Sequence, residues 1–311
     1  MKKATKNLSR LFPALMALAI VTVSSCNKKS SDPVLPPIGG YNNSNEVAAA
    51  NLKAHWTFDG SSNDAITSTA PSTSLRASFV TGIKGQALHL DSGYLIYPAM
   101  ASLNGTSLGS NTVSAWIYTD NQGAGSSPTS VFTLALAGAA TTDWNTGPIN
   151  MYLENGRPTT YDDTLVLHSA IATYIAGSRY GGDNINDYGA REVDFKTVKG
   201  TNKWVHYVMV YDGAASTLDI YANGVLVSNN NFRHKTYGAS IGFGPIALPS
   251  GVTSTQVLIG GFPNTTTGFA GSVLQSWQGL YRGNIDELRV YNKVLTSAEI
   301  TALYQLELAG R

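Results

Sequence analysis

The chain has 311 residues and a formal net charge of +1, and only 13% of its residues are charged, compared with about 25% in a typical soluble protein. Proteins that bind nucleic acid need dense clusters of Lys and Arg to displace counterions from phosphates, and the sequence has none, so we expect no nucleic-acid partner. The 31 glycines, with a surplus of Ser, Thr and Asn, indicate a β-rich exported protein with many turns.

The first segment, residues 1–25, has the pattern of an export signal. Four basic residues precede an apolar stretch at 11–23, which is too short to span a membrane stably. The stretch ends in Val23-Ser24-Ser25-Cys26, which resembles the bacterial lipobox, where the cysteine is acylated after cleavage. The alternative is a general secretory signal with an incidental cysteine, although Cys26 is the only cysteine in the chain. The sequence therefore predicts lipidation at Cys26 and attachment to the outer membrane through lipid alone.

Residues 26–50 are rich in Pro, Gly and Asn, a composition typical of a flexible, extended tether that buries little surface. Polar residues directly after a lipidated cysteine resemble the surface-export signals of outer-membrane lipoproteins that gather glycans. This resemblance favours a protein that faces the cell exterior, and periplasmic retention is the alternative. We expect the tether to end at residue 50 and one folded domain to occupy 51–311.

From residue 51 onward the strongest pattern has a period of two, which is typical of half-buried strands. In the first such segment, Leu52, Ala54, Trp56 and Phe58 are expected to share one face. The clearest hairpin spans 218–227, because its centre is Asn223-Gly224, the pair preferred where both turn residues need a positive φ. Further strands are expected at 87–90, 94–97, 112–118, 131–135, 165–168, 203–211, 256–259 and 285–291.

One helix is expected near the C-terminus. Thr296 and Glu299 have the spacing of a capping box, and Ile300, Leu303 and Tyr304 supply one apolar face. Many short strands and a single helix predict an all-β fold, a two-sheet antiparallel jelly-roll sandwich.

Four segments together resemble laminin G-like domains of the concanavalin A type. In chain order, the first three are 54–60, 82–88, and 203–208 with 221–224, and they match the family in the same order. The fourth, 283–300, is similar to the family's final strand and helix. The resemblance covers about residues 50–306 and implies a jelly roll, whereas the family's functions range from lectins to adhesion modules and enzyme accessory domains.

The same resemblance implies a structural Ca²⁺ site. In laminin G-like domains an Asp on the last strand can join the loop after the first strand in holding Ca²⁺, and the matching ligands here are Asp59, Asn63, Asp64 and Asp286. Asp286 has the same strand parity as Leu288 and Val290, so a buried carboxylate is expected there, and it needs neutralisation. The alternatives are a hydrogen-bonded Asp286 or a salt bridge to Arg289 or Arg282.

Hydrolysis is a weaker hypothesis. Glucan hydrolases of the concanavalin A type carry Glu-x-Asp-x-x-Glu on one strand, and 192–197 supplies the first two acids but has Thr197 in place of the third. We therefore expect no catalytic residues.

Aromatic residues in polar loops are the candidate ligand contacts, because sugar rings stack on aromatic side chains. They are Trp144, Tyr180, Tyr188 and Trp277, and two long loops, about 120–150 and 228–255, could shape a groove. These features predict a lipid-anchored, non-catalytic, lectin-like protein that binds a polysaccharide or glycoconjugate as part of a glycan-capture system. The alternative is an adhesion module that binds another protein of a surface complex.

Overall fold

The computed structural model describes residues 35–104, 107–120, 127–137, 143–155, 163–187, 196–269 and 271–311. Cys26 and the predicted signal peptide lie outside these ranges, as do Tyr188 and residues 192–195 of the incomplete glucanase signature. Pro36–Arg311 form one compact unit. In the part of the chain that the structure describes, no helix combines the length and the apolar character needed to cross a bilayer.

Antiparallel strands dominate this unit. In chain order they are β1 (Leu52–Trp56), β2 (Thr73–Thr81), β3 (Gln86–Ala99), β4 (Asn111–Tyr118), β5 (Thr129–Leu136), β6 (Ile149–Leu153), β7 (Thr164–Leu165), β8 (Leu167–Ile175), β9 (Ser178–Ile185), β10 (Val198–Lys199), β11 (Val205–Asp212), β12 (Thr217–Ala222), β13 (Val225–Leu226), β14 (Thr236–Tyr237), β15 (Ile241–Gly242), β16 (Thr255–Ile259) and β17 (Tyr281–Tyr291). The α-helix is α1 (Ser297–Leu308), and the short 3₁₀ segments are η1 (Ser44–Glu46), η2 (Ala49–Asn51), η3 (Ala101–Leu103), η5 (Asn230–Phe232) and η6 (Thr265–Thr267).

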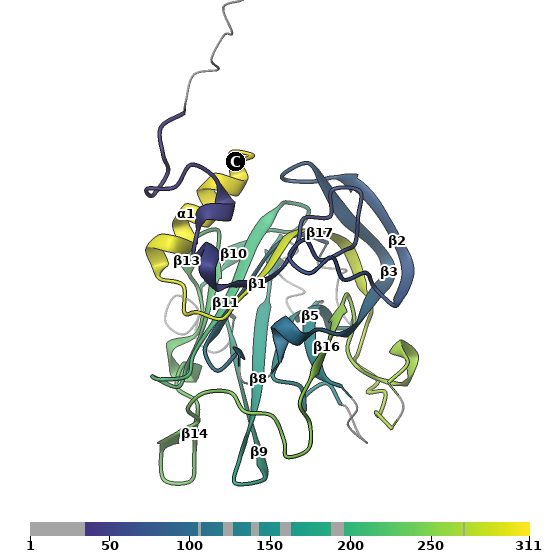
Figure 1. The fold of residues 1–311 in the computed structure, drawn as a ribbon, viewed down its shortest axis with the longest axis vertical. Coiled ribbons are helices and arrows are strands. Elements are labelled where there is room, and N and C mark those ends of the chain that lie inside the picture. The colour runs from purple at the N-terminus through teal and green to yellow at the C-terminus, as the bar shows by residue number, and fades with distance from the viewer. Residues whose placement is uncertain are drawn as a thin grey trace, which may run out of the picture. The chain divides into compact units, whose positions relative to one another are not determined.

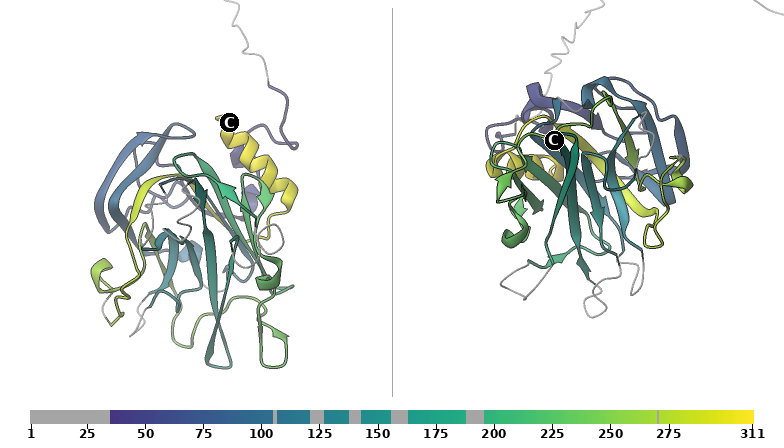
Figure 2. Two further views of the ribbon diagram at one scale, coloured as in Figure 1. Left: turned by 180° about the vertical axis from the view of Figure 1, so that it is seen from behind. Right: turned by 90° about the horizontal axis from the view of Figure 1, so that it is seen from below.

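Thirteen of the strands form one curled sheet (Figures 1 and 2). Its order is β13-β12-β11-β4-β17-β3-β16-β5-β6-β8-β9, with β1 paired to β17 and β2 paired to β3. One face of the sheet encloses the main core, to which β4 contributes Val113, Ala115 and Ile117, and β6 contributes Met151 and Leu153. This mostly β sandwich with one helix confirms the predicted concanavalin A-like jelly roll.

The hairpin and the helix were predicted correctly. Asn223 and Gly224 join β12 to β13 with φ values of +50° and +80°, the backbone that this pair adopts readily. Thr296 and Glu299 form the capping box at the start of α1. The helix packs Ile300 and Leu303 against the outer side of β11 through a second, smaller apolar cluster.

A bulge in the last strand makes the parity prediction for Asp286 wrong. The core residues of β17 are Tyr281, Ile285, Leu288 and Val290, and the register with β4 shifts between Asp286 and Arg289. Glu287, with φ +46°, absorbs the extra residue of this bulge. Asp286 therefore lies opposite Trp116, on the side of the strand away from the main core, although it is fully buried.

A similar shift makes the prediction for Leu52 wrong. The register of β1 against β17 changes between Leu52 and Ala54, so Leu52 packs against the cluster under α1. Ala54, Trp56 and Phe58 do lie in the main core, as predicted.

The strand predicted at 131–135 is confirmed as β5, and it divides the long loop expected at about 120–150. Two other stretches differ from the prediction: the polar stretch around 180–186 belongs largely to β9, and the tether does not reach residue 50. Residues 36–50 belong to the compact unit, and they lie beside α1 and the C-terminus in Figure 1. Val47 of this segment is only 1% exposed, and Arg311 donates to the carbonyl of Pro36 over 2.9 Å.

Candidate functional site

The outward face of β5, β6, β8 and β9 carries polar and aromatic side chains. In β6, Asn150 and Tyr152 alternate with core residues, so they point away from the core. The register places Asn150 opposite Ala170 of β8, and Ala170 opposite Asp183 of β9. These alternating positions therefore form one continuous surface across three strands.

Two of the predicted ligand contacts meet on this surface. The rings of Trp144 and Trp277 are 5.1 Å apart between centroids and perpendicular, at 90°. Tyr152 lies 6.4 Å from Trp144, and Phe262 lies 5.2 Å from Trp277. Both tryptophans are only partly buried, so together they present an aromatic edge to solvent.

Local hydrogen bonds hold Trp144 in place. Asp143 accepts from the Trp144 backbone N–H over 2.8 Å, and Thr146 donates back to the Asp143 carbonyl over 2.8 Å. From β6, the Asn150 amide donates to the Trp144 carbonyl over 3.3 Å. The loop before β6 is therefore a closed turn tied to the strand that it precedes, and the ring is positioned without a ligand.

A cavity of about 250 Å³ lies beside Trp144. Small residues such as Ala170 and Gly181 leave space along β8 and β9, while Asn150, Arg179 and Asp183 contribute polar groups. Arg179 donates to the Asn145 carbonyl over 3.1 Å, which joins β9 to the turn that carries Trp144. The combination of an aromatic wall, an amide and two charged groups suits a polyhydroxylated ligand.

His168 links two carboxylates next to this cavity. Its Nδ1 lies 2.8 Å from Glu154 Oε1 and its Nε2 lies 2.7 Å from Asp183 Oδ2, while Tyr152 stacks on the ring with centroids 4.4 Å apart. Burial lowers the pKa of His168, but the hydrogen bonds to Asp183 and Glu154 outweigh burial and raise it. The hydrogen bond to His168 in turn lowers the pKa of Asp183. These contacts therefore favour the protonated form of the imidazole and the ionised form of Asp183.

Tyr180, a third predicted ligand contact, does not join this surface. Tyr180 lies in β9 opposite Thr173, on the core side, where it packs against Tyr237 and Phe243 at 4.6 and 6.1 Å between ring centroids. Tyr188 lies outside the described residues. The sequence interpretation missed Asn150, Tyr152, His168 and Arg179, although the period-two pattern of β6 and β8 could have indicated the first three.

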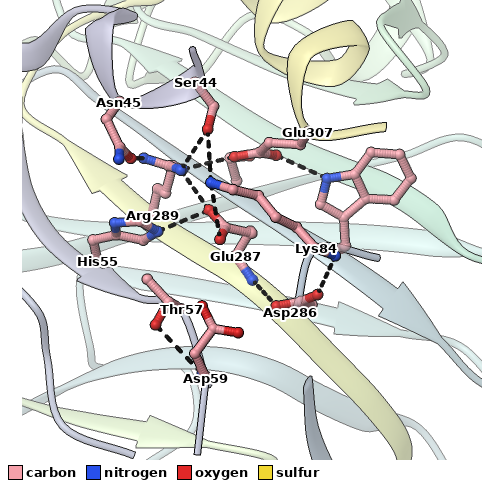
Figure 3. A network of polar contacts seen from close by, with 12 residues as sticks. Ser44, Asn45, His55, Thr57, Asp59, Lys84, Asp286, Glu287, Arg289 and Glu307 are labelled. Atoms are coloured by element: carbon pink, nitrogen blue, oxygen red, sulfur yellow. Dashed lines mark hydrogen bonds and ion pairs between the residues drawn. The ribbon is translucent and has the colours of Figure 1, made fainter. Parts of the chain in front are cut away.

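The predicted calcium ligands Asp59 and Asp286 approach one turn, Gly82–Gln86, between β2 and β3 (Figure 3). Asp286 Oδ2 accepts from the backbone N–H groups of Ile83 and Lys84 over 2.9 and 3.1 Å, and Asp59 Oδ1 accepts from that of Gln86 over 2.7 Å. Asp286 Oδ1 also accepts from the Glu287 N–H over 2.8 Å. Asp286 is therefore a buried, hydrogen-bonded carboxyl group, which is one of the alternatives to a metal ligand considered above.

The other two predicted ligands do not converge on these carboxylates. Asp64 Oδ1 accepts from the His55 N–H over 2.7 Å, and its Oδ2 accepts from the N–H and the hydroxyl of Thr67, both over 2.6 Å. Asn63 is exposed and donates its backbone N–H to Ser61. Among the residues that the structure describes, no three His, Cys, Asp or Glu side chains are placed to hold a metal ion. The four predicted ligands do not converge on one point in the described arrangement, and the calcium site stays a prediction.

The surroundings of Asp286 predict a pH-dependent contribution to stability. Burial raises its pKa from 3.8 to about 8, against the backbone N–H groups that lower it. The folded protein therefore holds this proton more tightly than the unfolded chain, so the contribution is complete below pH 3.8 and is lost as the pH rises toward about 8. Asp286→Asn cannot titrate, so its free energy of unfolding relative to the parent protein should increase between those pH values, by at most about 1.4 kcal/mol per pH unit. Denaturant unfolding at a series of pH values measures this difference, and a constant difference would show that Asp286 is ionised throughout.

A second polar network lies between the sheet, α1 and η1 (Figure 3). Its centre is Arg289, which is fully buried and donates to Glu307 Oε1 over 2.8 Å and also to Glu287 Oε2. Arg289 further donates to Ser44 Oγ and Asn45 Oδ1 over 3.1 and 3.0 Å. The network therefore ties the last strand to the final helix and to the segment before β1, which gives it a structural role.

Other groups also contact the two glutamates, and they include Lys84, whose Nζ lies 3.5 Å from Glu287 Oε1. Trp116 Nε1 donates to Glu307 Oε2 over 2.8 Å, and His55 Nε2 lies 2.9 Å from Glu287 Oε2. Burial raises the pKa of Glu287, but the hydrogen bond to His55 and the charge of Arg289 outweigh burial and lower it to about 2.

Comparisons with known proteins agree with this fold. The family model described as the concanavalin A-like lectin/glucanases superfamily, of the laminin G type, matches residues 91–301. A search of curated protein sequences finds no match. Among solved structures, the binding domain of botulinum neurotoxin serotype D/C is similar, with a TM-score of 0.53, 11% identity, and coverage of 84% of this chain and 53% of that one.

Two further structures are similar. The binding domain of botulinum neurotoxin DC in complex with SialylT has a TM-score of 0.51 and 12% identity, with 84% and 52% coverage. Domain 4 of AbnA, an extracellular arabinanase from Geobacillus stearothermophilus, in complex with arabinotriose, has a TM-score of 0.47 and 18% identity, with 82% and 98% coverage. The chain spans about half of each neurotoxin domain, and at these identities the likeness shows the fold alone. With a family model matching most of the jelly roll, the chain belongs to the concanavalin A-like lectin/glucanase superfamily.

Proposed function

We propose that this domain binds a polysaccharide or glycoconjugate, without catalysis, on the outward face of β5, β6, β8 and β9. The observation that carries the proposal is the perpendicular pair Trp144 and Trp277, 5.1 Å apart, beside a cavity of about 250 Å³. The pair is assembled from two loops far apart in sequence, one before β6 and one before β17. Partly exposed tryptophans next to hydrogen-bonding groups are the arrangement that the C–H faces and hydroxyls of a sugar require.

Binding follows from the groups that line the cavity. A sugar ring stacks against Trp144, which lines the cavity and is supported from outside it by Trp277, while its hydroxyls accept from Arg179 and Asn150 and donate to Asp183. The turn that carries Trp144 is already closed by hydrogen bonds, so little ordering is needed on binding. A shallow site of this kind binds weakly, and many copies on one surface would retain a polymer by avidity.

Hydrolysis fits the same face less well. A glycosidase needs one carboxylic acid that keeps its proton, which requires a raised pKa. The pKa of Asp183 is instead lowered by its hydrogen bond to His168. His168 also occupies the space between Asp183 and Glu154 that the sugar bond or the attacking water would need. These contacts favour a positioning role for the two carboxylates over acid catalysis.

We further propose that lipidation at Cys26 attaches the protein to the outer membrane, with the domain facing outward. The compact unit begins at Pro36, next to the C-terminal Arg311, and the tips of the β8–β9 and β14–β15 hairpins lie at the opposite end of the unit (Figure 1). An anchor reaching the unit at Pro36 would leave those hairpins farthest from the point of attachment. Structural Ca²⁺ at Asp59, Asn63, Asp64 and Asp286 stays a separate proposal, supported by the family resemblance.

Replacing either tryptophan should weaken glycan binding. We expect Trp277→Ala and Trp144→Ala each to reduce retention at least about tenfold in affinity electrophoresis through gels that contain soluble arabinan, xylan, mannan or laminarin. Trp277→Phe keeps a smaller ring and should lose less. The matched control is Phe79→Ala, which removes an exposed aromatic ring on β2, outside this face.

The outcome also separates the two candidate functions. If no polysaccharide retards the parent protein and a partner protein co-purifies with it, glycan binding is contradicted and the adhesion module is favoured. Val273 and Leu274, 60% and 49% exposed in the loop that carries Trp277, are the surface that such a protein partner would contact.

A further inference from the structure

A second cavity, of about 470 Å³, opens on the outward side of β2, β3, β4 and β17. Tyr118 and Asn284 line it from adjacent strands. The neighbouring residues Ile117 and Ile285 point the other way, into the main core. This cavity therefore lies on a different outward surface from the one beside Trp144, and none of its lining residues belongs to that site.

Side chains from three neighbouring strands form the floor of the cavity, in one row across the sheet. The register aligns His89 of β3 with Asn284 of β17, and Asn284 with Tyr118 of β4. Trp204, just before β11, extends the row, with its ring 5.7 Å from that of Tyr118 and edge-on at 63°. Hydrogen bonding between His89 Nδ1 and Asn284 Oδ1, over 2.7 Å, fixes the imidazole and leaves Nε2 uncommitted among the described residues.

Two charged side chains at the rim also have polar atoms that find no partner among the described residues. Asp120 Oδ1 is buried and accepts no hydrogen bond from any described residue. Arg282 is exposed and forms no ion pair within the described part of the chain. Hydrogen bonds hold together the backbone segments that carry these two side chains. Thr119 Oγ1 donates to the Arg282 carbonyl over 2.8 Å, and the Asn202 N–H donates to the Thr119 carbonyl over 2.9 Å. A buried acceptor without a donor is costly, so a ligand that supplies the donor gains free energy there.

We propose that this cavity is a second saccharide site, specific for a neutral sugar unit. Neighbouring hydroxyl groups can donate to Asp120 and accept from Arg282 at the same time, which no simple ion can do. An anionic ligand would oppose Asp120, and a cationic ligand would oppose Arg282. His89, Asn284 and the edge of Tyr118 supply the further polar and aromatic contacts that orient a ring.

The second site makes the domain bivalent and extends the proposed function. Two sites on separate outward surfaces cannot engage one sugar unit, so each binds a different unit of a long polymer or of two polymers. The second contact then forms at a high effective concentration, and retention exceeds what either site gives alone.

The test compares four proteins by affinity electrophoresis in the same arabinan, xylan, mannan and laminarin gels. They are the parent protein, Asp120→Asn with Arg282→Gln, Trp277→Ala, and the three changes combined. Arg76→Gln, which removes an exposed arginine on β2 outside both cavities, is the matched control, and unfolding midpoints confirm that every variant folds. We expect the Asp120/Arg282 variant to lose retention tenfold or more while keeping some, and the combined variant to lose all of it.

Each other outcome is informative. If the Asp120/Arg282 variant migrates like Arg76→Gln while Trp277→Ala abolishes retention, the second site is overturned and the first stands. If Trp277→Ala changes nothing and the Asp120/Arg282 variant loses all retention, the proposed function of the Trp144 face fails and the second site stands alone. If no polysaccharide retards the parent protein, both proposals are overturned.

Discussion

Replacing Arg289 with methionine is expected to lower the free energy of unfolding by about 3–5 kcal/mol, because it leaves two buried carboxylates without their main cation. Arg289, Glu287 and Glu307 are all fully buried, so water cannot replace the lost ion pairs. Burial already raises the pKa of Glu307 to about 7, against the charge of Arg289, which lowers it. Without that charge, Glu307 would have to take up a proton or draw water into the core, and Glu287 would keep Lys84, with Nζ 3.5 Å from its Oε1, as a cationic partner.

The comparison that checks this result uses two arginines of the same strand. Arg282→Met, at the exposed beginning of β17, should change the free energy of unfolding by no more than about 0.5 kcal/mol in denaturant titrations. Adding Glu287→Gln and Glu307→Gln to Arg289→Met should recover part of the loss, since it removes the charges left unpaired. Equal stability of the two single variants would contradict the structural role of the network.

The network also explains which parts of the fold the sequence could predict. Period-two alternation and turn chemistry are local, so β4, the hairpin at Asn223-Gly224 and the capping box at Thr296 could be predicted from neighbouring residues. The bulge at Glu287 could not, because its positive φ is stabilised by contacts with His55 and Arg289 rather than by a turn residue. One extra residue there places Asp286 and Leu288 on opposite faces of the strand, whereas strict alternation would place them on the same face.

The candidate site shows the same limit. Trp144 and Trp277 could each be selected as aromatic residues in polar loops, but their 5.1 Å contact depends on how β5, β6 and β17 are placed in the sheet. Tyr180 has similar surroundings in sequence, yet the register of β9 turns it toward the core. Local composition therefore identified Trp144 and Trp277 as candidates, but it could not show which of the candidate aromatic residues lie together on one face.

A chain that begins at Asn51, the domain boundary that composition favoured, should be much less stable than one that begins at Pro36. The shorter chain loses the burial of Val47, which is worth about 1.5–3 kcal/mol. It also loses the Ser44 and Asn45 acceptors for Arg289, and hydrogen bonds to charged groups contribute about 1.5–3 kcal/mol each. Since such contributions are not fully additive, we expect the free energy of unfolding to fall by about 3–6 kcal/mol.

Single substitutions in the longer chain separate the two contributions. Val47→Ala removes only apolar contact, whereas Asn45→Ala leaves one N–H group of Arg289 without its acceptor. If both variants are destabilised and the shorter chain is destabilised further, residues 36–50 are part of the fold and the tether can occupy only 26–35. Equal stability of the two chain lengths would instead mean that the segment rests on the domain without supporting it. In that case the linker before the folded domain would extend to residue 50.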